Sequence, residues 1–154
     1  MFVLKVYFHI ICIFKVLFYK IIYGNSFVMP RTSTFRTGFH LVVESSGGVR
    51  IGDRCFFNNY CTLASRSGID IGDGTIFGEN VKVYDHNHCY KDIQRPIKEQ
   101  GYTSAPIKIG KHCWIASNVI ILKGVTIGDN CVIGAGCVVY KDVPEGSVVI
   151  NSQK

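Results

Sequence analysis

Apolar residues recur every six positions through the C-terminal part of the chain. Read in sixes from Ile109, the sequence gives IGKHCW, IASNVI, ILKGVT, IGDNCV, IGAGCV and VYKDVP. The first position of each six is Ile or Val, and the fifth is Cys or Val. A helix repeats its apolar face about every 3.6 residues and a half-buried strand every second residue, so neither explains this period. A hexapeptide period is typical of a solenoid, in which each repeat buries its apolar face against its neighbours.

The same period covers residues 51–85, with one shift and one break. Its sixes are led by Ile51, Phe57, Leu63, Ile71, Phe77 and Val83. The frame shifts by two residues at Ile69-Asp70, and the period fails over residues 86–106 before it resumes at Ile109. Because three such strands close one triangular coil, we predict an all-β fold. The expected architecture is a parallel β-helix over residues 51–154, with residues 86–106 as an extruded loop.

Residues 25–50 precede the regular sixes and carry turn signals at Pro30 and at residues 45–48. Between these turns, His40–Glu44 has the composition of a strand and predicts a first, imperfect coil. Within the sixes, Gly, Asp and Asn recur at the second to fourth positions, as in Gly72-Asp73-Gly74 and Gly128-Asp129-Asn130. These residues tolerate left-handed and tight backbone conformations, so we expect them at the corners of the coils.

Residues 1–24 form the most apolar segment and predict an amphipathic helix with a wide apolar face, ended by Gly24-Asn25. The polar side of this helix gathers Lys5, His9, Cys12, Lys15 and Lys20. Two interpretations remain open. The apolar face packs on the solenoid or on a neighbouring subunit, or the helix lies on an anionic membrane through its lysines.

The same segment bears on localisation. Its longest lysine-free run, Val6–Phe14, is shorter than the ~20 residues of a bilayer span, and no signal-peptide cleavage site follows it. We therefore expect a cytoplasmic protein. In the membrane interpretation of the helix, the protein is peripheral on the inner face of the membrane.

Charge and cysteine content narrow the function classes. The chain has a formal net charge of +6 at pH 7 and seven cysteines. Five cysteines fall at the fifth position of a six: Cys55, Cys61, Cys113, Cys131 and Cys137. There a thiol acts as a small buried hydrophobe, and no spacing suits zinc, so we predict core thiols in a reducing compartment and no metal site. No basic stripe with interleaved aromatic residues is present, so nucleic-acid binding is not expected.

Four C-terminal motifs resemble those of the hexapeptide-repeat acyltransferases. They are W-I-A-S at Trp114–Ser117, I-L-x-G-V-x-I-G at Ile121–Gly128, I-G-A-G at Ile133–Gly136 and K-D-V-P at Lys141–Pro144. Within that family, the chain is most similar to the galactoside and maltose O-acetyltransferases and to the acetyltransferases of polysaccharide gene clusters. The resemblance implies a left-handed parallel β-helix and a homotrimer. It also implies that acetyl-CoA lies between adjacent helices, in a site shared by two subunits.

The function that the resemblance implies is an acetyl-CoA-dependent O-acetyltransferase. The acceptor would be a hydroxyl of a sugar, of a polysaccharide precursor or of a lipid-linked saccharide. No GxSxG motif points to a covalent acyl-enzyme, so direct transfer with a general base is expected. Two alternatives stay open: an N-acyltransferase on an amino sugar, and a non-catalytic β-helix scaffold.

The break in the repeat places the candidate base. Histidine titrates near neutral pH, and loops extruded from rigid scaffolds commonly carry function. By the resemblance, the catalytic histidine stands at the start of this loop, which favours His86 and leaves His88 as the alternative. Asp85 is a candidate to orient the imidazole. Asn58 matches an asparagine of the family's acceptor pocket, and it also fits a plain corner turn.

The resemblance also assigns candidate contacts to acetyl-CoA. The matching positions are Trp114, Ala116, Ser117, Ala135, Tyr140 and Lys141. An oxyanion donor is expected from a backbone N–H near Ser117. Lys141 has the strongest physical case, because a cation near a phosphate makes a charge-assisted hydrogen bond. Ala116 stands where the family usually has glycine, and Tyr140 where threonine is more common.

Overall fold

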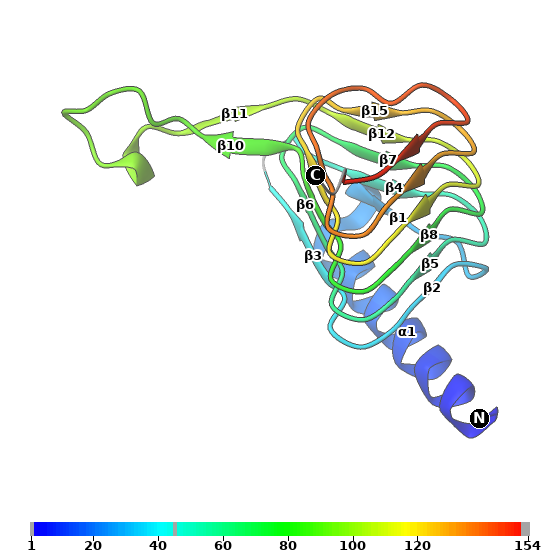
Figure 1. The fold of residues 1–154 in the computed structure, drawn as a ribbon. Coiled ribbons are helices and arrows are strands. Elements are labelled where there is room, and N and C mark those ends of the chain that lie inside the picture. Colours follow the sequence, from blue (N-terminus) through cyan, green and yellow to red (C-terminus); the bar gives the residue numbers. More distant parts are fainter. Residues whose placement is uncertain (1, 45, 152–154) are drawn as a thin grey trace.

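The computed structural model describes residues 2–44 and 46–151. Most of the chain winds as a solenoid whose strands form three parallel sheets (Figure 1). Sheet A contains β1 (Phe27–Val28), β4 (Val49–Ile51), β7 (Ile69–Ile71), β12 (Ile107–Ile109) and β15 (Thr126–Ile127). Sheet B contains β2 (Thr34–Phe35), β5 (Phe56–Phe57), β8 (Ile76–Phe77), β13 (Trp114–Ile115), β16 (Val132–Ile133) and β18 (Val148–Val149). Sheet C contains β3 (His40–Val43), β6 (Thr62–Ser65), β9 (Lys82–Tyr84), β14 (Ile120–Leu122) and β17 (Val138–Val139).

The sheet register stacks the first position of each six into columns inside the solenoid. Phe57 pairs with Phe77, and Ile115 pairs with both Phe77 and Ile133. The Phe57 and Phe77 rings stack with their centroids 4.4 Å apart. The side chains at all these positions are almost completely buried. The six-residue period is therefore the spacing that returns an apolar side chain to the interior at every turn of the coil.

Backbone conformation at the corners depends on position within the six. The fourth residue repeatedly adopts a left-handed φ, for example 56° at Arg54, 69° at Gly74 and 58° at Asn130. The second residue is limited by space instead. A Cβ at Gly72 would lie 2.7 Å from the backbone of Gly110 and Lys111 in the next coil. The turn residues thus meet two separate requirements, a left-handed φ at the fourth position and close coil stacking at the second.

The five cysteines at fifth positions are buried, as predicted, with exposed fractions of 2% or less. They also link successive coils. The Sγ atoms of Cys55 and Cys113 donate to the carbonyls of Gly72 at 3.2 Å and Gly128 at 3.1 Å. Thr75 occupies the same position between them, and its hydroxyl donates to the next coil at 2.7 Å. Burial raises the pKa of the Cys55, Cys61 and Cys113 thiols, to about 11 at Cys61, which suits structural groups.

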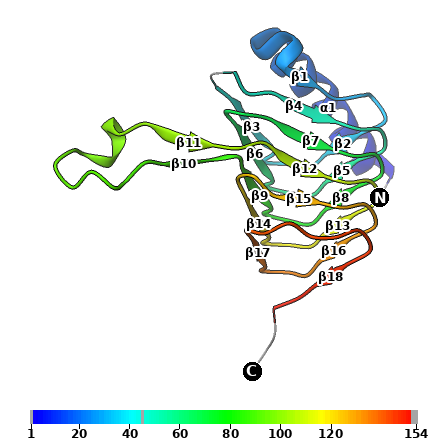
Figure 2. The ribbon, with the colours of Figure 1, turned by 90° about the horizontal axis from the view of Figure 1, so that it is seen from above.

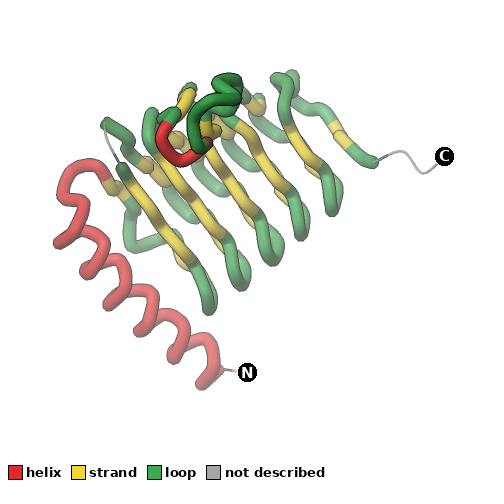
Figure 3. The backbone as a smooth tube through the Cα atoms, turned by 90° about the vertical axis from the view of Figure 1, so that its left-hand side faces the viewer, coloured by secondary structure: helices red, strands yellow, loops and turns green. Residues whose placement is uncertain are grey.

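The N-terminal helix α1 (Phe2–Tyr23) lies across the first coil at one end of the solenoid (Figure 3). A single 3-10 turn, Gly24–Ser26, leads from the helix into the first strand. Residues 27–43 then supply one strand to each of the three sheets, so this coil is complete. The carbonyl of Phe39 accepts from Tyr19 Oη at 3.3 Å and from Lys15 Nζ, and Tyr23 Oη donates to the Leu41 carbonyl at 3.3 Å.

The face that α1 packs on the solenoid differs from the expected one. Cys12 and Tyr19 are buried, and Lys15 is turned toward the coil, whereas the wide apolar face stays open. The expectation that this apolar face packs on the chain's own solenoid is therefore wrong. The first coil presents backbone carbonyls at its open end, and these require donors that Tyr19 and Lys15 supply and aliphatic side chains do not.

The extruded loop forms an antiparallel hairpin of β10 (His86–His88) and β11 (Tyr102–Ser104), with a 3-10 turn at Ile97–Glu99. We call residues 86–104 the arm. It leaves the solenoid after β9 and projects away from the solenoid wall (Figure 2). The amide of Ala105 donates to the Asp85 carbonyl at 2.9 Å and closes the base of the arm.

Candidate functional site

The predicted site residues other than Trp114 fall on two different corners of the solenoid. The B–C corner, between sheets B and C, consists of residues 36–39, 58–61, 78–81, 116–119 and 134–137. The C–A corner, between sheets C and A, includes residues 44, 46–48, 66–68, 85–106, 123–125 and 140–142. The arm belongs to the C–A corner (Figure 1).

Asp85 is a completely buried carboxylate at the base of the arm. It accepts hydrogen bonds from the amides of Arg66 at 2.8 Å, Ser67 at 2.7 Å and Gly68 at 2.7 Å. The Ser65 hydroxyl donates to it at 2.9 Å. Burial by itself would raise the pKa of Asp85, but the donors from Gly68, Arg66 and Ser67 outweigh it and hold this pKa below its ordinary value. The carboxylate is therefore ionised at neutral pH.

His86 lies directly against this carboxylate. Its Nδ1 is 3.0 Å from Asp85 Oδ1, and 19% of its side chain is exposed. Because an ionised carboxylate only accepts, the proton of a neutral His86 ring resides on Nδ1. The other ring nitrogen, Nε2, is then the acceptor, which is the protonation state a general base requires.

His88 has a different environment. It is exposed on the arm, and its ring packs against Tyr102 with a centroid distance of 4.4 Å. Tyr102 also meets the His86 ring edge-on at 5.5 Å. The Arg66 guanidinium lies 3.8 Å from the centre of the Tyr102 ring and pairs with the Glu44 carboxylate. Tyr102 therefore packs against the rings of both histidines. His86 differs from His88 in its additional contact with the Asp85 carboxylate.

Sequence reasoning missed the residues that hold Asp85. The amides of residues 66–68 come from the coil before the arm, at the corner where the frame shifts by two residues. That shift in the six-residue frame was the feature of the sequence that could have pointed to these amides. Two extra residues between Leu63 and Ile71 lengthen this coil beside the arm, and the amides of its corner surround the carboxylate.

The B–C corner brings together four of the other predicted residues. Asn58 Oδ1 accepts from the Asn59 amide at 2.9 Å and from Arg36 at 3.3 Å. Two coils further on, the Ser117 hydroxyl accepts from the Glu79 amide at 3.1 Å. Ala116 is buried beside Ser117, and Ala135 is exposed on the next coil.

The remaining predicted residues lie elsewhere. Tyr140 and Lys141 are exposed on the C–A corner, with Lys141 Nζ 5.8 Å from the centre of the Tyr140 ring. Trp114 lies on the outer face of sheet B and is 52% exposed. Since sheet C separates the two corners, one chain does not bring His86 together with Asn58 or Ser117.

Two further features bear on the chemistry of the site. A hollow of about 550 Å³ lies along the arm and is lined by residues that include His88, Tyr90, Arg95 and Lys123. This volume is in the range of small-molecule sites. Within residues 2–44 and 46–151, no group of three or more His, Cys, Asp or Glu side chains is placed to hold a metal ion.

Known proteins show the same fold and repeat. A family described as bacterial transferase hexapeptide (six repeats) matches residues 106–141. The galactoside O-acetyltransferase of Escherichia coli (strain K12) is 38% identical over 101 residues, covering 65% of this chain and 48% of the relative. The structure of a maltose O-acetyltransferase from Clostridium difficile 630 matches with a TM-score of 0.62 and 32% identity, covering 84% of this chain and 67% of that one. This chain belongs to the hexapeptide-repeat acyltransferase family.

Membership of the hexapeptide-repeat acyltransferases confirms the predicted fold class, a left-handed parallel β-helix. A hexapeptide-repeat acetyltransferase from Vibrio cholerae, solved in complex with acetyl coenzyme A, also matches with a TM-score of 0.62 and 32% identity. That match covers 71% of this chain and 58% of the other. The chain spans between 35% and 63% of the length of four curated relatives that it matches.

Proposed function

We propose that this protein is an acetyl-CoA-dependent O-acetyltransferase that acts on a sugar or polysaccharide-precursor hydroxyl. The contact between the ionised Asp85 carboxylate and His86 Nδ1 carries the proposal, because it leaves Nε2 available as a base at the mouth of the arm. Family relatives support the reaction class. They include enzymes named as galactoside and maltose O-acetyltransferases, and the hexapeptide-repeat acetyltransferase from Vibrio cholerae was solved with acetyl coenzyme A.

In the proposed reaction, His86 Nε2 takes the proton of the acceptor hydroxyl as its oxygen attacks the thioester carbonyl. The new C–O bond forms, the C–S bond breaks, and the proton passes from the imidazolium to the leaving thiolate. Asp85 stabilises the imidazolium that forms between these steps. A backbone N–H near Ser117 would meet the negative charge that develops on the carbonyl oxygen.

The groups available for the coenzyme fit its chemistry. Lys141 offers an exposed cation to a phosphate, and Tyr140 offers an exposed ring beside it. Ala135 is exposed and small, so it leaves room for a pantetheine arm, while the buried Ala116 methyl intrudes little. These assignments remain those implied by the family resemblance.

A shared site between subunits would join the two corners. The outer face of sheet B carries an apolar stripe in register across the strands: Phe56, Ile76, Trp114, Val132 and Val148. The outer face of sheet A carries polar residues such as Arg50 and Asp70 instead. We infer that the sheet B stripe is buried in a homotrimer and that sheet A faces solvent. The B–C corner of one subunit would then lie beside the arm of the next.

The proposal names acetyl-CoA as the acetyl donor but gives the acceptor only as a chemical class. Polar and aromatic side chains along the arm, including Tyr90 and Arg95, suit a sugar ring. An amino-sugar acceptor uses the same base and stays the second candidate. A purely structural β-helix has no need for an ionised carboxylate buried against a histidine, and that observation weighs against a scaffold.

The test compares two matched histidine variants. His86→Gln should lower kcat/KM for coenzyme A release by at least about 10²-fold, because the general base is lost. His88→Gln should stay within about fivefold of wild type, because no carboxylate of residues 2–44 and 46–151 pairs with His88 as Asp85 does with His86. The assay uses acetyl-CoA with a panel of sugars, nucleotide sugars and amino sugars. Full activity of His86→Gln would refute the assignment, and preference for an amino sugar would select the N-acyltransferase.

A further inference from the structure

The face of α1 that points away from the solenoid is apolar along its length. Its centre line carries Ile10, Phe14, Leu17 and Ile21, which are 48%, 69%, 51% and 83% exposed. Further exposed apolar residues flank this line: Val6, Tyr7, Ile11, Ile13, Phe18 and Ile22. We call these ten residues the open face of α1. Contiguous apolar surfaces of this kind mark sites of interaction with a partner or a membrane.

The lysine in the middle of the helix does not interrupt this face. Lys15 Nζ donates to the Phe39 carbonyl and lies 5.8 Å from the centre of the Tyr19 ring, on the side that packs against the solenoid. Burial lowers the pKa of Lys15 accordingly. The expectation that the helix meets a membrane through its lysines therefore does not hold for Lys15. The open face itself is the candidate contact surface.

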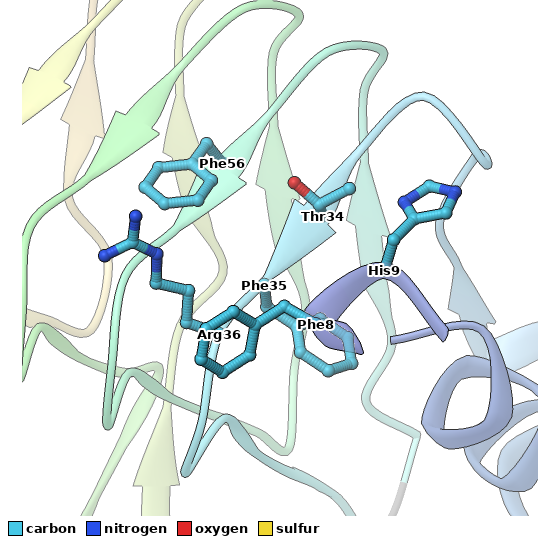
Figure 4. Close-up of a pocket in the computed structure, with 6 residues that line it drawn as sticks. All are labelled: Phe8, His9, Thr34, Phe35, Arg36 and Phe56. Carbon is cyan, nitrogen blue, oxygen red and sulfur yellow. The ribbon is translucent and has the colours of Figure 1, made fainter. Parts of the chain in front are cut away.

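Basic side chains border the open face where the helix meets the first coil. A groove of about 130 Å³ along this seam is lined by Leu17, Lys20 and Arg31 among others. A neighbouring groove of about 300 Å³ is lined by Phe8 and His9 of α1, by Thr34 and Phe35 of β2, by Arg36 and by Phe56 of β5 (Figure 4). Lys20, Arg31 and Arg36 are exposed. The border of the open face is thus cationic and suits phosphate groups.

The charge of the chain is concentrated at this end. Residues 1–43 contain five Lys or Arg and no Asp or Glu, and the first acidic residue is Glu44. Residues 44–154 contain 12 basic and 11 acidic residues, so nearly all of the net charge of +6 belongs to the helix and the first coil. A second copy of this end would be repelled by like charge, whereas an anionic surface is attracted to it.

We propose that α1 lies in the plane of an anionic membrane, with its open face in the boundary between headgroups and acyl chains. Lys20 and Arg31 would then contact lipid phosphates. The helix lies at one end of the solenoid with its open face turned outward, so docking needs no rearrangement (Figure 3). The coils would stand on the bilayer, and the arm would project sideways from the solenoid wall (Figure 2).

The packing of α1 on the first coil favours a helix that lies on the membrane over one that crosses it. Val6–Ser26 is long and apolar enough to span a bilayer, with a mean hydropathy of 1.7. A spanning helix would have to leave the first coil, which would strip donors from the Phe39 carbonyl and carry Lys15 into lipid. Both changes are costly in hydrocarbon, and the in-plane orientation avoids them.

Flotation of the full chain with lipid vesicles tests the proposal. The protein is synthesised cell-free with vesicles of phosphatidylcholine alone or with about 30% phosphatidylglycerol, an anionic lipid. We expect binding at least about tenfold tighter to the anionic vesicles, weakening as salt rises from about 0.05 to about 0.5 M. The variant Phe14→Glu/Leu17→Glu should lose at least about tenfold in binding, because both side chains enter the apolar layer.

A matched control keeps the result specific. Ile150→Glu changes a residue that is 70% exposed near the opposite end of the solenoid, and it should float like wild type. Equal flotation of the Phe14→Glu/Leu17→Glu variant, equal binding to both vesicle types, or binding unaffected by salt would overturn the proposal. No flotation of the wild type together with a smaller oligomer in the variant would assign the open face to a protein contact instead. Acetyl transfer plays no part in this readout, so the outcome is independent of the proposed activity.

Discussion

The Asp85 carboxylate lies at a corner where two successive coils depart from the six-residue frame. The first departure adds two residues between Leu63 and Ile71, on either side of the corner at residues 66–68, and the second extrudes the arm. Together they place three amide donors and an imidazole around one buried carboxylate. A buried charge is costly unless it is hydrogen-bonded, and here the backbone supplies most of the bonds.

Asp85→Asn should lower kcat by about 10²- to 10⁴-fold, because the amide side chain does not fix the Nδ1 proton or stabilise an imidazolium. Steady-state kinetics with acetyl-CoA measure the loss. Asp70→Asn, on the outer face of sheet A, is the control and should retain activity. Unchanged turnover by the Asp85 variant would show that His86 needs no positioning group.

The same substitution should change the acid stability of the protein. The native pKa of Asp85 is depressed, so its ionised form contributes stability that is complete above the ordinary pKa of about 3.9 and is lost as pH falls through the native pKa. Asp85→Asn should therefore be less stable than wild type at pH 7, by roughly 1–3 kcal/mol. This difference should shrink toward acid pH. Urea unfolding at several pH values measures it, and a difference independent of pH would contradict the linkage.

Between neighbouring coils, stability depends on how closely their corners approach. The second-position glycines form a column in which each backbone touches the next coil, as at Gly72. The thiol and hydroxyl groups at the fifth position donate to carbonyls of the following coil at the same corner. The cysteine and glycine columns are therefore parts of one stacking arrangement.

Gly72→Ala should destabilise the solenoid by roughly 1–3 kcal/mol, because its Cβ would overlap the backbone of Gly110 and Lys111. Gly48→Ala is the matched control, since the nearest atom to its Cβ is the Ser26 carbonyl oxygen at 3.4 Å. Thermal unfolding of both variants tests the contrast. Equal melting temperatures would mean that the coils can separate slightly at no cost.

For the whole molecule, the separation of the two corners leads to a test of the proposed trimer. His86 and Asn58 lie on opposite sides of sheet C, so only neighbouring subunits can combine them in one pocket. His86→Gln and Asn58→Ala should each be impaired as pure proteins. When equal amounts of the two are unfolded and refolded together, roughly a quarter of all subunit contacts would carry both native residues, and activity should return to that extent. No recovery, despite mixed trimers, would place both residues in the same subunit's site.

The sequence determined the repeat, the buried columns, the position of the arm and the candidacy of His86. These follow from local pattern, because a period of six allows few ways to bury every first and fifth residue. Helix α1 was also predictable from its composition. Its orientation was not, since an apolar face shows only that burial is favourable and does not identify what covers it.

The tertiary structure decided which groups meet. It placed the amides of residues 66–68 around Asp85, turned Lys15 inward, and separated Asn58 from His86 by a full sheet. Each of these depends on contacts between residues about 17 or more positions apart along the chain, and such contacts have no local signature in the repeat. Pattern alone therefore identified the candidate residues, and the packing of successive coils determined their environments.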